Sequence, residues 1–290
     1  MIQIVATFAR RIGLLALVAV SNGCTGLSVI GPVTDPASEL IAKGEHEFKQ
    51  GQVSESLRTL SRAIQTAPER ADLWNARGFV YSRQHQMVKA VADFKEAIRL
   101  QPSQPMYLNN LGVAYLEQGS PQEALQVLND ANHAAPRSVL VLVHRALTYR
   151  HVGQLDHALV DLSQALELDD RNVTAYANRA VVYALQHNYP AAKRDLDRAA
   201  SLNSSMKEIY ESRALIQLLT GRPDLAAKDF SSAIALGASD TLIYYNRAVA
   251  RTLLGDTRLA EEDYARACGR GYAPACSSTR QVASIIDPHL

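Results

Sequence analysis

The hydrophobic and polar positions of this chain repeat every 34 residues between positions 37 and 274. Within each period, apolar residues are spaced three and four apart, which gives a helix one buried stripe. The stripe appears twice per period and is interrupted between its two occurrences. In the second period its members are Trp74, Gly78 and Tyr81, followed by Val91, Phe94, Ala97 and Ile98. The pattern therefore predicts an array of paired helices.

Small residues keep the same register along the array. One series of alanines recurs without a slip at Ala63, Ala97, Ala131, Ala165, Ala199, Ala233 and Ala267. A second series occupies Gly44, Gly78, Gly112, Ala146, Ala180, Ala214 and Ala248. Small side chains let two helices approach at the short end of the usual separation of about 8–10 Å. The bulky residue of one helix is expected to fill the space that they leave on the other.

The breaks between helices carry the residues that turns and helix ends require. Glycine stands between the two helices of five periods, at Gly51, Gly119, Gly153, Gly221 and Gly255. A positive φ angle is often needed at such a point, and glycine adopts it without a steric cost. Pro68, Pro102 and Pro136 follow the second helix of the first three periods, and proline cannot continue a helix.

The repeat resembles the tetratricopeptide repeat, and the resemblance covers about four-fifths of the chain. The second period carries the family pattern at Trp74, Gly78, Tyr81, Ala90, Phe94, Ala97 and Pro102. The resemblance implies an all-α, right-handed superhelical solenoid of seven 34-residue helix-turn-helix repeats. The expected repeats are 37–70, 71–104, 105–138, 139–172, 173–206, 207–240 and 241–274, and we number positions from the first residue of each.

Charged residues at positions seven and 23 appear and disappear together. Five repeats carry both, as Arg77 with Asp93, Arg145 with Asp161, Arg179 with Asp195, Arg213 with Asp229, and Arg247 with Asp263. The first and third repeats lack both the arginine and the aspartate, with Lys43 and Thr59 in one and Leu111 and Val127 in the other. This correlation predicts structural ion pairs between helices. An arginine track for an anionic ligand is the alternative interpretation.

The first 23 residues predict a bacterial-type export signal. Arg10 and Arg11 precede an apolar run at 12–20, and small residues follow before Cys24. That run is too short to cross a bilayer, which takes about 20 residues. The Gly23-Cys24 junction resembles a lipoprotein signal, although Ser21 stands where that group prefers leucine. The alternatives are a soluble exported protein, or an uncleaved or cytosolic one in which Cys24 is a stray thiol.

The two ends of the array have their own expected roles. Residues 24–36 read as a lipidated cysteine and a linker that reaches about 40 Å when extended. Residues 275–290 are expected to form a helix and tail that cap the last repeat, since a solenoid needs a terminal cap. The spacing of Cys268 and Cys276 resembles the disulfide-bonded pairs of exported cysteine-rich helical repeats. Two reduced, packed thiols are the alternative.

Composition narrows the function to binding. Removing residues 1–23, which contain two arginines and no acid, changes the formal net charge from +1 to −1. A chain with so little net charge is not expected to bind nucleic acid, which favours a strongly basic face. No phosphate loop, nucleophile elbow or dinucleotide fingerprint is present, so we expect no enzyme activity, no cofactor, no metal and no small-molecule substrate. His144 and His151 lie two helical turns apart, too far to share one metal without other ligands.

The family resemblance places positions five, six, nine and twelve of the first helices on a concave, peptide-binding groove. The residues expected to line it are Asn75, Phe79, Asn109, Asn110, Val113, Leu116, His144, Leu147, Asn178, Tyr245 and Asn246. An asparagine amide both donates and accepts, so Asn110, Asn178 and Asn246 are candidates to hold a peptide backbone. The alternative is that these asparagines bond within the superhelix.

These observations predict a lipid-anchored scaffold of the cell envelope, facing the periplasm from the outer membrane. Its partner would be a protein segment, extended or helical, held in the groove, and the membrane would be contacted through the lipid alone. The chain resembles two lipoprotein groups equally, the pilus and secretin pilotins and the adaptors of peptidoglycan hydrolases. A non-lipidated periplasmic repeat protein, or an accessory subunit of an envelope enzyme, is the alternative.

Overall fold

The computed structural model describes residues 35–277, in which fourteen helices and no strand are found. The expected export signal, Cys24, the linker to residue 34 and positions 278–290 of the expected cap lie outside these residues. The helices are α2 (Pro36–Lys49), α3 (Val53–Thr66), α4 (Ala71–Arg83), α5 (Met87–Leu100), α6 (Pro105–Gln118), α7 (Pro121–Ala134), α8 (Val139–His151), α9 (Leu155–Leu168), α10 (Val173–Leu185), α11 (Tyr189–Leu202), α12 (Lys207–Leu219), α13 (Pro223–Ala235), α14 (Thr241–Leu254) and α15 (Thr257–Gly269).

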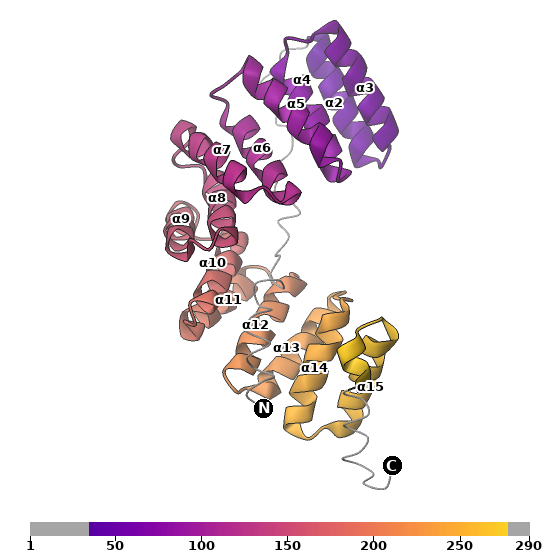
Figure 1. Ribbon diagram of the computed structural model, residues 1–290, viewed down its shortest axis with the longest axis vertical. Helices are drawn as coiled ribbons and strands as arrows, with labels where there is room; N and C mark the ends of the chain where they lie inside the picture. The colour runs from indigo at the N-terminus through magenta and orange to yellow at the C-terminus, as the bar shows by residue number, and fades with distance from the viewer. Residues whose placement is uncertain (1–34, 278–290) are drawn as a thin grey trace. The chain divides into compact units, whose positions relative to one another are not determined.

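The described residues fall into two compact units that we treat separately. The N-terminal unit runs from residue 35 to residue 170 and holds α2 to α9, whereas the C-terminal unit runs from residue 171 to residue 277 and holds α10 to α15. Within each unit, successive helices pack as helix pairs, one pair per 34-residue repeat (Figure 1). Even-numbered helices are the first helices of their repeats and odd-numbered helices are the second. This is the all-α repeat fold that the hydrophobic period predicts.

The array begins one residue earlier than the pattern predicted. The side chain of Asp35 accepts hydrogen bonds from the backbone N–H groups of Ala37 and Ser38 at 2.8 and 3.0 Å. Proline suits the first turn of a helix because the missing N–H would have no partner there. Pro36, which we had assigned to the linker, is therefore the first residue of α2.

The small residues sit where first and second helices of a repeat cross. All seven members of the Ala63 series have no solvent exposure. A Cβ atom added to Gly112 would lie 2.5 Å from Cγ of Leu128, and one added to Gly78 would lie 2.9 Å from a ring carbon of Phe94. Carbon atoms do not approach that closely without displacement, so glycine at these two positions permits the helix contact.

The turn between the two helices uses a left-handed residue at position 15 of every repeat. Gly119 and Gly255, with φ of 84° and 81°, end α6 and α14 in this conformation. The second and fifth repeats have no glycine there, and His85 and His187 adopt φ of 55° and 60° instead. The turn is therefore imposed by the helix pairs on either side of it, since a side chain at positive φ has a steric cost.

Candidate partner-binding face

The arginine–aspartate pairs join the helices of each repeat. In all five repeats, Nε and Nη2 of the arginine donate to the two carboxylate oxygens of the aspartate sixteen residues later, at 2.7–2.9 Å. The aspartate side chains are at most 9% exposed. Two parallel bonds of this kind fix both side chains. We call this set the arginine–aspartate ladder.

The same arginines also reach the preceding repeat. Nη1 of Arg77, Arg145 and Arg247 donates to Ser61, Asn129 and Ser231 on the second helix of the repeat before, at 3.1–3.3 Å. Nη1 of Arg213 donates to Asp197 at 2.9 Å. The guanidinium carbons also lie 5.1–5.9 Å from the centres of tyrosine or tryptophan rings on their own first helices. This geometry fits a structural ladder and leaves little of each guanidinium for an anionic ligand.

A second polar network runs between first helices in the N-terminal unit. Nδ2 of Asn110 donates to Oδ1 of Asn75 at 2.9 Å, and Nδ1 of His144 lies 2.8 Å from Oδ1 of Asn109. Both pairs join position five of one repeat to position six of the next, and we call them the polar relay. All four side chains are at most 3% exposed. Burial without a charged partner lowers the pKa of His144 to about 4, so this histidine is neutral near pH 7.

The relay corrects the expected role of several groove residues. The amide of Asn110 is already used by Asn75, and Nδ2 of Asn178 donates to the carbonyl of Thr174 at 2.9 Å. Asn178 is 1% exposed, so a peptide backbone does not reach it in this structure. For Asn75, Asn109, Asn110, His144 and Asn178, bonding or burial within the array is what the structure shows. In the sequence, amides at position five of one repeat and position six of the next occur together only as Asn75 and Asn110.

Other expected groove residues do reach the surface. The partly exposed members at positions five, nine and twelve are Phe79, Val113, Leu116 and Leu147 in the N-terminal unit, and Leu218, Tyr245 and Val249 in the C-terminal unit. We call these two sets the first-helix face of each unit. Phe79 packs edge-on against Phe48, with ring centres 5.6 Å apart. Apolar side chains left half-open on consecutive helices form a surface that a partner can cover.

Carboxylates that our sequence reasoning missed border this face. Desolvation raises the pKa of Glu45 and of Glu117 in the N-terminal unit, although Lys49 opposes the first shift and His85 and Arg83 oppose the second. In the C-terminal unit, Glu211 stands at position five of the sixth repeat. Their signal in the sequence was weak, because a glutamate on a helix is most often a solvated residue.

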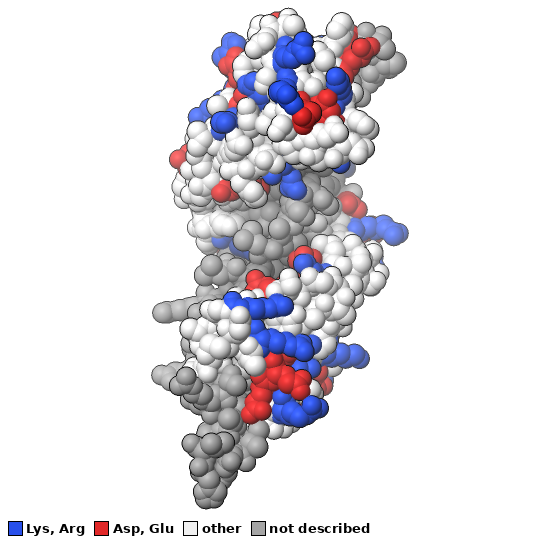
Figure 2. Space-filling view, turned by 90° about the vertical axis from the view of Figure 1, so that its right-hand side faces the viewer, with Lys and Arg blue, Asp and Glu red and all other residues white. Residues whose placement is uncertain are grey.

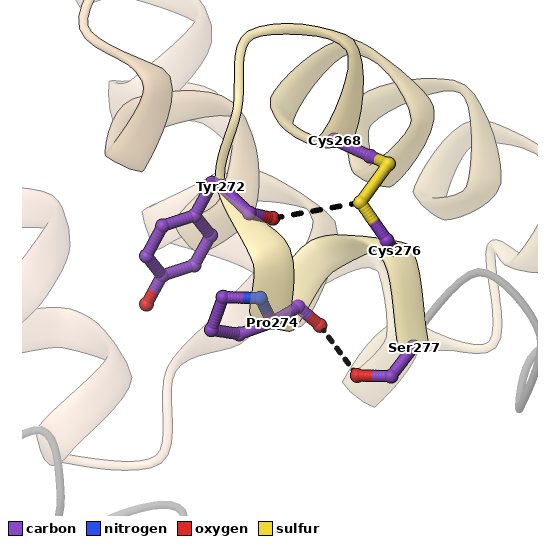
Figure 3. Close-up of a disulfide and its surroundings, with 5 residues drawn as sticks. All are labelled: Cys268, Tyr272, Pro274, Cys276 and Ser277. Atoms are coloured by element: carbon purple, nitrogen blue, oxygen red, sulfur yellow. Dashed lines mark hydrogen bonds between the residues drawn. A yellow bond between two sulfur atoms is a disulfide. The ribbon is translucent and has the colours of Figure 1, made fainter.

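The end of the seventh repeat is closed covalently. Sγ atoms of Cys268 and Cys276 are bonded at 1.98 Å, which joins the end of α15 to the segment after it (Figure 3). That segment places Ala275 in the core without solvent exposure. The ring of Tyr272 packs edge-on against Tyr245, with centres 4.9 Å apart. The segment after α15 thus covers part of the C-terminal first-helix face.

Three further observations concern nucleic-acid binding, metal binding and membrane spanning. On the side shown in Figure 2, blue and red side chains lie next to one another, so that side carries no continuous basic stripe for phosphates. Within residues 35–277, no three His, Cys, Asp or Glu side chains are grouped to hold a metal ion. None of the helices in that range is long and apolar enough to span a bilayer.

The family pattern of the tetratricopeptide repeat matches residues 41–105, 80–139 and 185–241. The chain belongs to the tetratricopeptide repeat family. Proteins of this fold are in general non-catalytic scaffolds for protein–protein interaction, and these repeats place the chain among them. No curated protein matches the sequence.

Solved structures share the fold at low identity. A tetratricopeptide repeat protein from Parabacteroides merdae is similar with a TM-score of 0.67 and 21% identity, over 85% of this chain and 98% of the other. The type IV pilus biogenesis factor PilW is similar with a TM-score of 0.65 and 15% identity, over 70% and 94%. Pseudomonas aeruginosa PilF gives 0.65 and 16%, over 75% and 98%.

Proposed function

We propose that this protein is an exported, lipid-anchored scaffold that holds a partner protein's segment on its first-helix faces during assembly of the cell envelope. The observation that carries the proposal is the row of half-open apolar residues Phe79, Val113, Leu116 and Leu147 on α4, α6 and α8. Each lies on a helix whose other side packs against neighbouring helices, so the position of these side chains is fixed before a partner binds. Binding to a rigid surface loses less conformational entropy than binding to a flexible one.

Specificity is expected to come from apolar pockets rather than from backbone gripping by asparagine. The amides that would grip a backbone are occupied or buried at Asn110 and Asn178. The partner's side chains must therefore supply most of the contact, and an apolar segment fits the N-terminal face. Truncating central apolar anchors of an interface has the largest effects on affinity.

The envelope role rests on the sequence and on the fold shared with pilus proteins. The export pattern of residues 1–23 and the cysteine at position 24 support lipid attachment. PilW is a pilus biogenesis factor with the same fold, which favours a role in pilus or secretin assembly as the first to test. Recruitment of a peptidoglycan hydrolase is the other role that the same face would serve.

Site-specific photocrosslinking in intact envelopes tests the binding face. A photoreactive phenylalanine analogue placed at Leu116 or at Leu147 should capture one partner, which mass spectrometry identifies as a pilus, secretin or hydrolase component. The matched controls are Val88 and Val160 on α5 and α9, which are 74% and 64% exposed and lie on second helices. Capture from the control positions, with none from Leu116 or Leu147, would reject the first-helix face.

The anchor has a separate test. Cys24→Ser should move the protein from the membrane fraction to the soluble periplasmic fraction, because each buried CH₂ of a lipid chain contributes about 0.8 kcal/mol to membrane binding. Labelling with a palmitate analogue should be lost in the same variant. Labelling that persists would place the lipid elsewhere or reject lipidation.

A further inference from the structure

The polar relay has an open counterpart in the C-terminal unit. In the N-terminal unit, position five of one first helix bonds to position six of the next, as Asn75 does with Asn110. On α12 and α14 the same two positions of the repeat are occupied by Glu211 and Asn246, which are also 35 residues apart. Neither side chain makes a hydrogen bond or ion pair with any residue between 35 and 277. This pair therefore lacks a hydrogen bond where each of its equivalents shares one, although Nδ2 of Asn109 and Nε2 of His144 are also buried without a partner.

The surroundings leave this pair little contact with water. Asn246 is only 5% exposed, and Glu211 is partly buried. One helical turn further along, Leu215 on α12 and Val249 on α14 belong to the apolar core of the unit. The polar atoms of the pair are not fully enclosed, so a ligand can reach them and supply the hydrogen bonds that the array does not.

The charge around the pair selects the kind of ligand. Glu208 lies on the same helix one turn before Glu211, and Asp240 precedes α14. Desolvation is the largest cause that raises the pKa of Glu211, which reaches about 7. The charge of Glu208 raises it further, Lys207 opposes the rise, and Asp240 adds to it. Two further carboxylates beside a half-buried one create a negative potential that a positive group relieves. An acidic or neutral ligand group would leave this repulsion in place.

We propose that Glu211 and Asn246 form a receptor site for a lysine or arginine side chain of the partner segment that lies on the C-terminal first-helix face. The carboxylate and the amide oxygen accept from the cation, and Tyr245, the residue before Asn246, is partly exposed on the same first helix. This inference rests on the proposed function, because it names the chemistry of the segment that the face holds. The preferred segment combines apolar residues with one basic residue.

Selection from a displayed library of random linear twelve-residue peptides tests the site, with the full chain as the bait. Peptides recovered on the wild-type protein should be enriched in one lysine or arginine at a fixed distance from apolar residues. On Glu211→Lys the enrichment should change from basic to acidic residues. On Glu211→Gln the basic preference should be lost, and a recovered basic peptide should bind about 10-fold to 100-fold more weakly. Isothermal titration calorimetry measures this change.

Controls separate the site from the fold and from the wider function. Glu261→Gln on the second helix α15 removes one carboxylate away from this face and should leave the selection unchanged. Circular dichroism should show that all three variants remain helical. Enriched peptides without a basic residue would overturn the receptor site and leave the proposed function standing. Recovery of no peptide on any bait would reject both.

Proton linkage gives a second readout of the same binding. A cation beside Glu211 favours the ionised carboxylate, so wild-type affinity for the recovered basic peptide should rise between pH 6 and pH 8. Calorimetry in buffers of different ionisation enthalpy should show proton release on binding below pH 7. Glu211→Gln should show neither effect. An affinity that does not depend on pH in the wild-type protein would exclude Glu211 as the acceptor.

Discussion

The two units use the same repeat but treat the contact between neighbouring first helices differently. In the N-terminal unit, Nδ2 of Asn110 donates a hydrogen bond to Oδ1 of Asn75 inside the array. In the C-terminal unit, Glu211 and Asn246 occupy the equivalent positions and have no partner among the described residues. A satisfied buried pair fixes the register of two helices, whereas an open one weakens the array and is available to a ligand. The difference suggests that the N-terminal contact serves the scaffold and the C-terminal one serves binding.

The largest expected loss of stability comes from breaking the arginine–aspartate ladder, and it should differ between the two units. Arg145→Leu leaves Asp161, which is 3% exposed, without its only described partner and should cost about 3–5 kcal/mol. Arg247→Leu should cost less, because Asp263 keeps the bond from Nη1 of Arg251 at 2.6 Å. Hydrogen exchange of the repeat that carries each change is the measurement, since a repeat array need not unfold in one step.

The double variant Arg145→Leu with Asp161→Val is the matched control for that prediction. It reproduces Leu111 and Val127 of the third repeat, where the chain has no such pair. Most of the lost stability should return, since no buried charge is left unpaired. Equal losses from Arg145→Leu and Arg247→Leu would show that the second arginine at Asp263 contributes nothing.

The second prediction compares the relay with its open counterpart. Asn110→Ala leaves Oδ1 of Asn75 buried without a donor and should cost about 1–3 kcal/mol. Asn246→Ala removes the same group at the same position of the seventh repeat but breaks no described hydrogen bond. Its cost should be about 0.5 kcal/mol or less in the absence of a ligand. Denaturant unfolding of the two variants measures the contrast, and equal costs would mean that the relay bond is not what separates the units.

These same positions show how much of the fold and of the binding face can be predicted from the sequence. The helix pairs and the arginine–aspartate distances follow from periodicity and from charges that appear together, because both are repeated features of the chain. For Asn110 and Asn178 the sequence left two interpretations, because the family resemblance assigned position six to the groove while the amides could also bond within the superhelix. Which side of a helix faces a neighbour depends on a rotation of a few tens of degrees, and amides do not reveal it. The contact of Tyr272 with Tyr245 was equally hidden, since it joins the segment after α15 to the first helix of the same repeat.

The third prediction uses pH to compare Glu211 with Glu117. Burial raises the pKa of Glu211 in the folded protein to about 7, from an ordinary glutamate value of 4.5. The native state therefore binds more protons between these two values, and its stability falls as pH rises through them. Glu211→Gln should remove this fall, so that the variant gains on the wild-type protein from pH 4.5 upward and the gain levels off above pH 7.

Glu117 supplies the comparison from the N-terminal unit. Desolvation also raises its pKa, but His85 and Arg83 act in the opposite direction. Glu117→Gln should therefore change stability in the same direction over a narrower pH range. Thermal melting between pH 4 and pH 9 measures both. The effect should be smaller than the loss of a buried hydrogen bond, because both carboxylates remain in contact with water. A larger gain for Glu117→Gln would contradict the charge difference between the two faces.

The smallest expected change in stability concerns position 15 of the repeat, where each unit has one histidine in place of glycine. His85 and His187 have φ of 55° and 60°, which disfavours any residue with a Cβ atom. Glycine removes that strain of about 1–2 kcal/mol, but it also makes the unfolded chain more flexible, at about 0.4–1 kcal/mol. His85→Gly should therefore stabilise the N-terminal unit by roughly 0.5 kcal/mol.

His187→Gly should gain less, because it loses the contact of Nδ1 with the hydroxyl of Tyr189 at 3.0 Å. Differential scanning calorimetry of both variants measures the pair, with Gln84→Gly, one residue before His85, as the control for added flexibility. A loss of stability in His85→Gly would mean that the strain at positive φ is smaller than the entropy that the histidine removes from the unfolded chain.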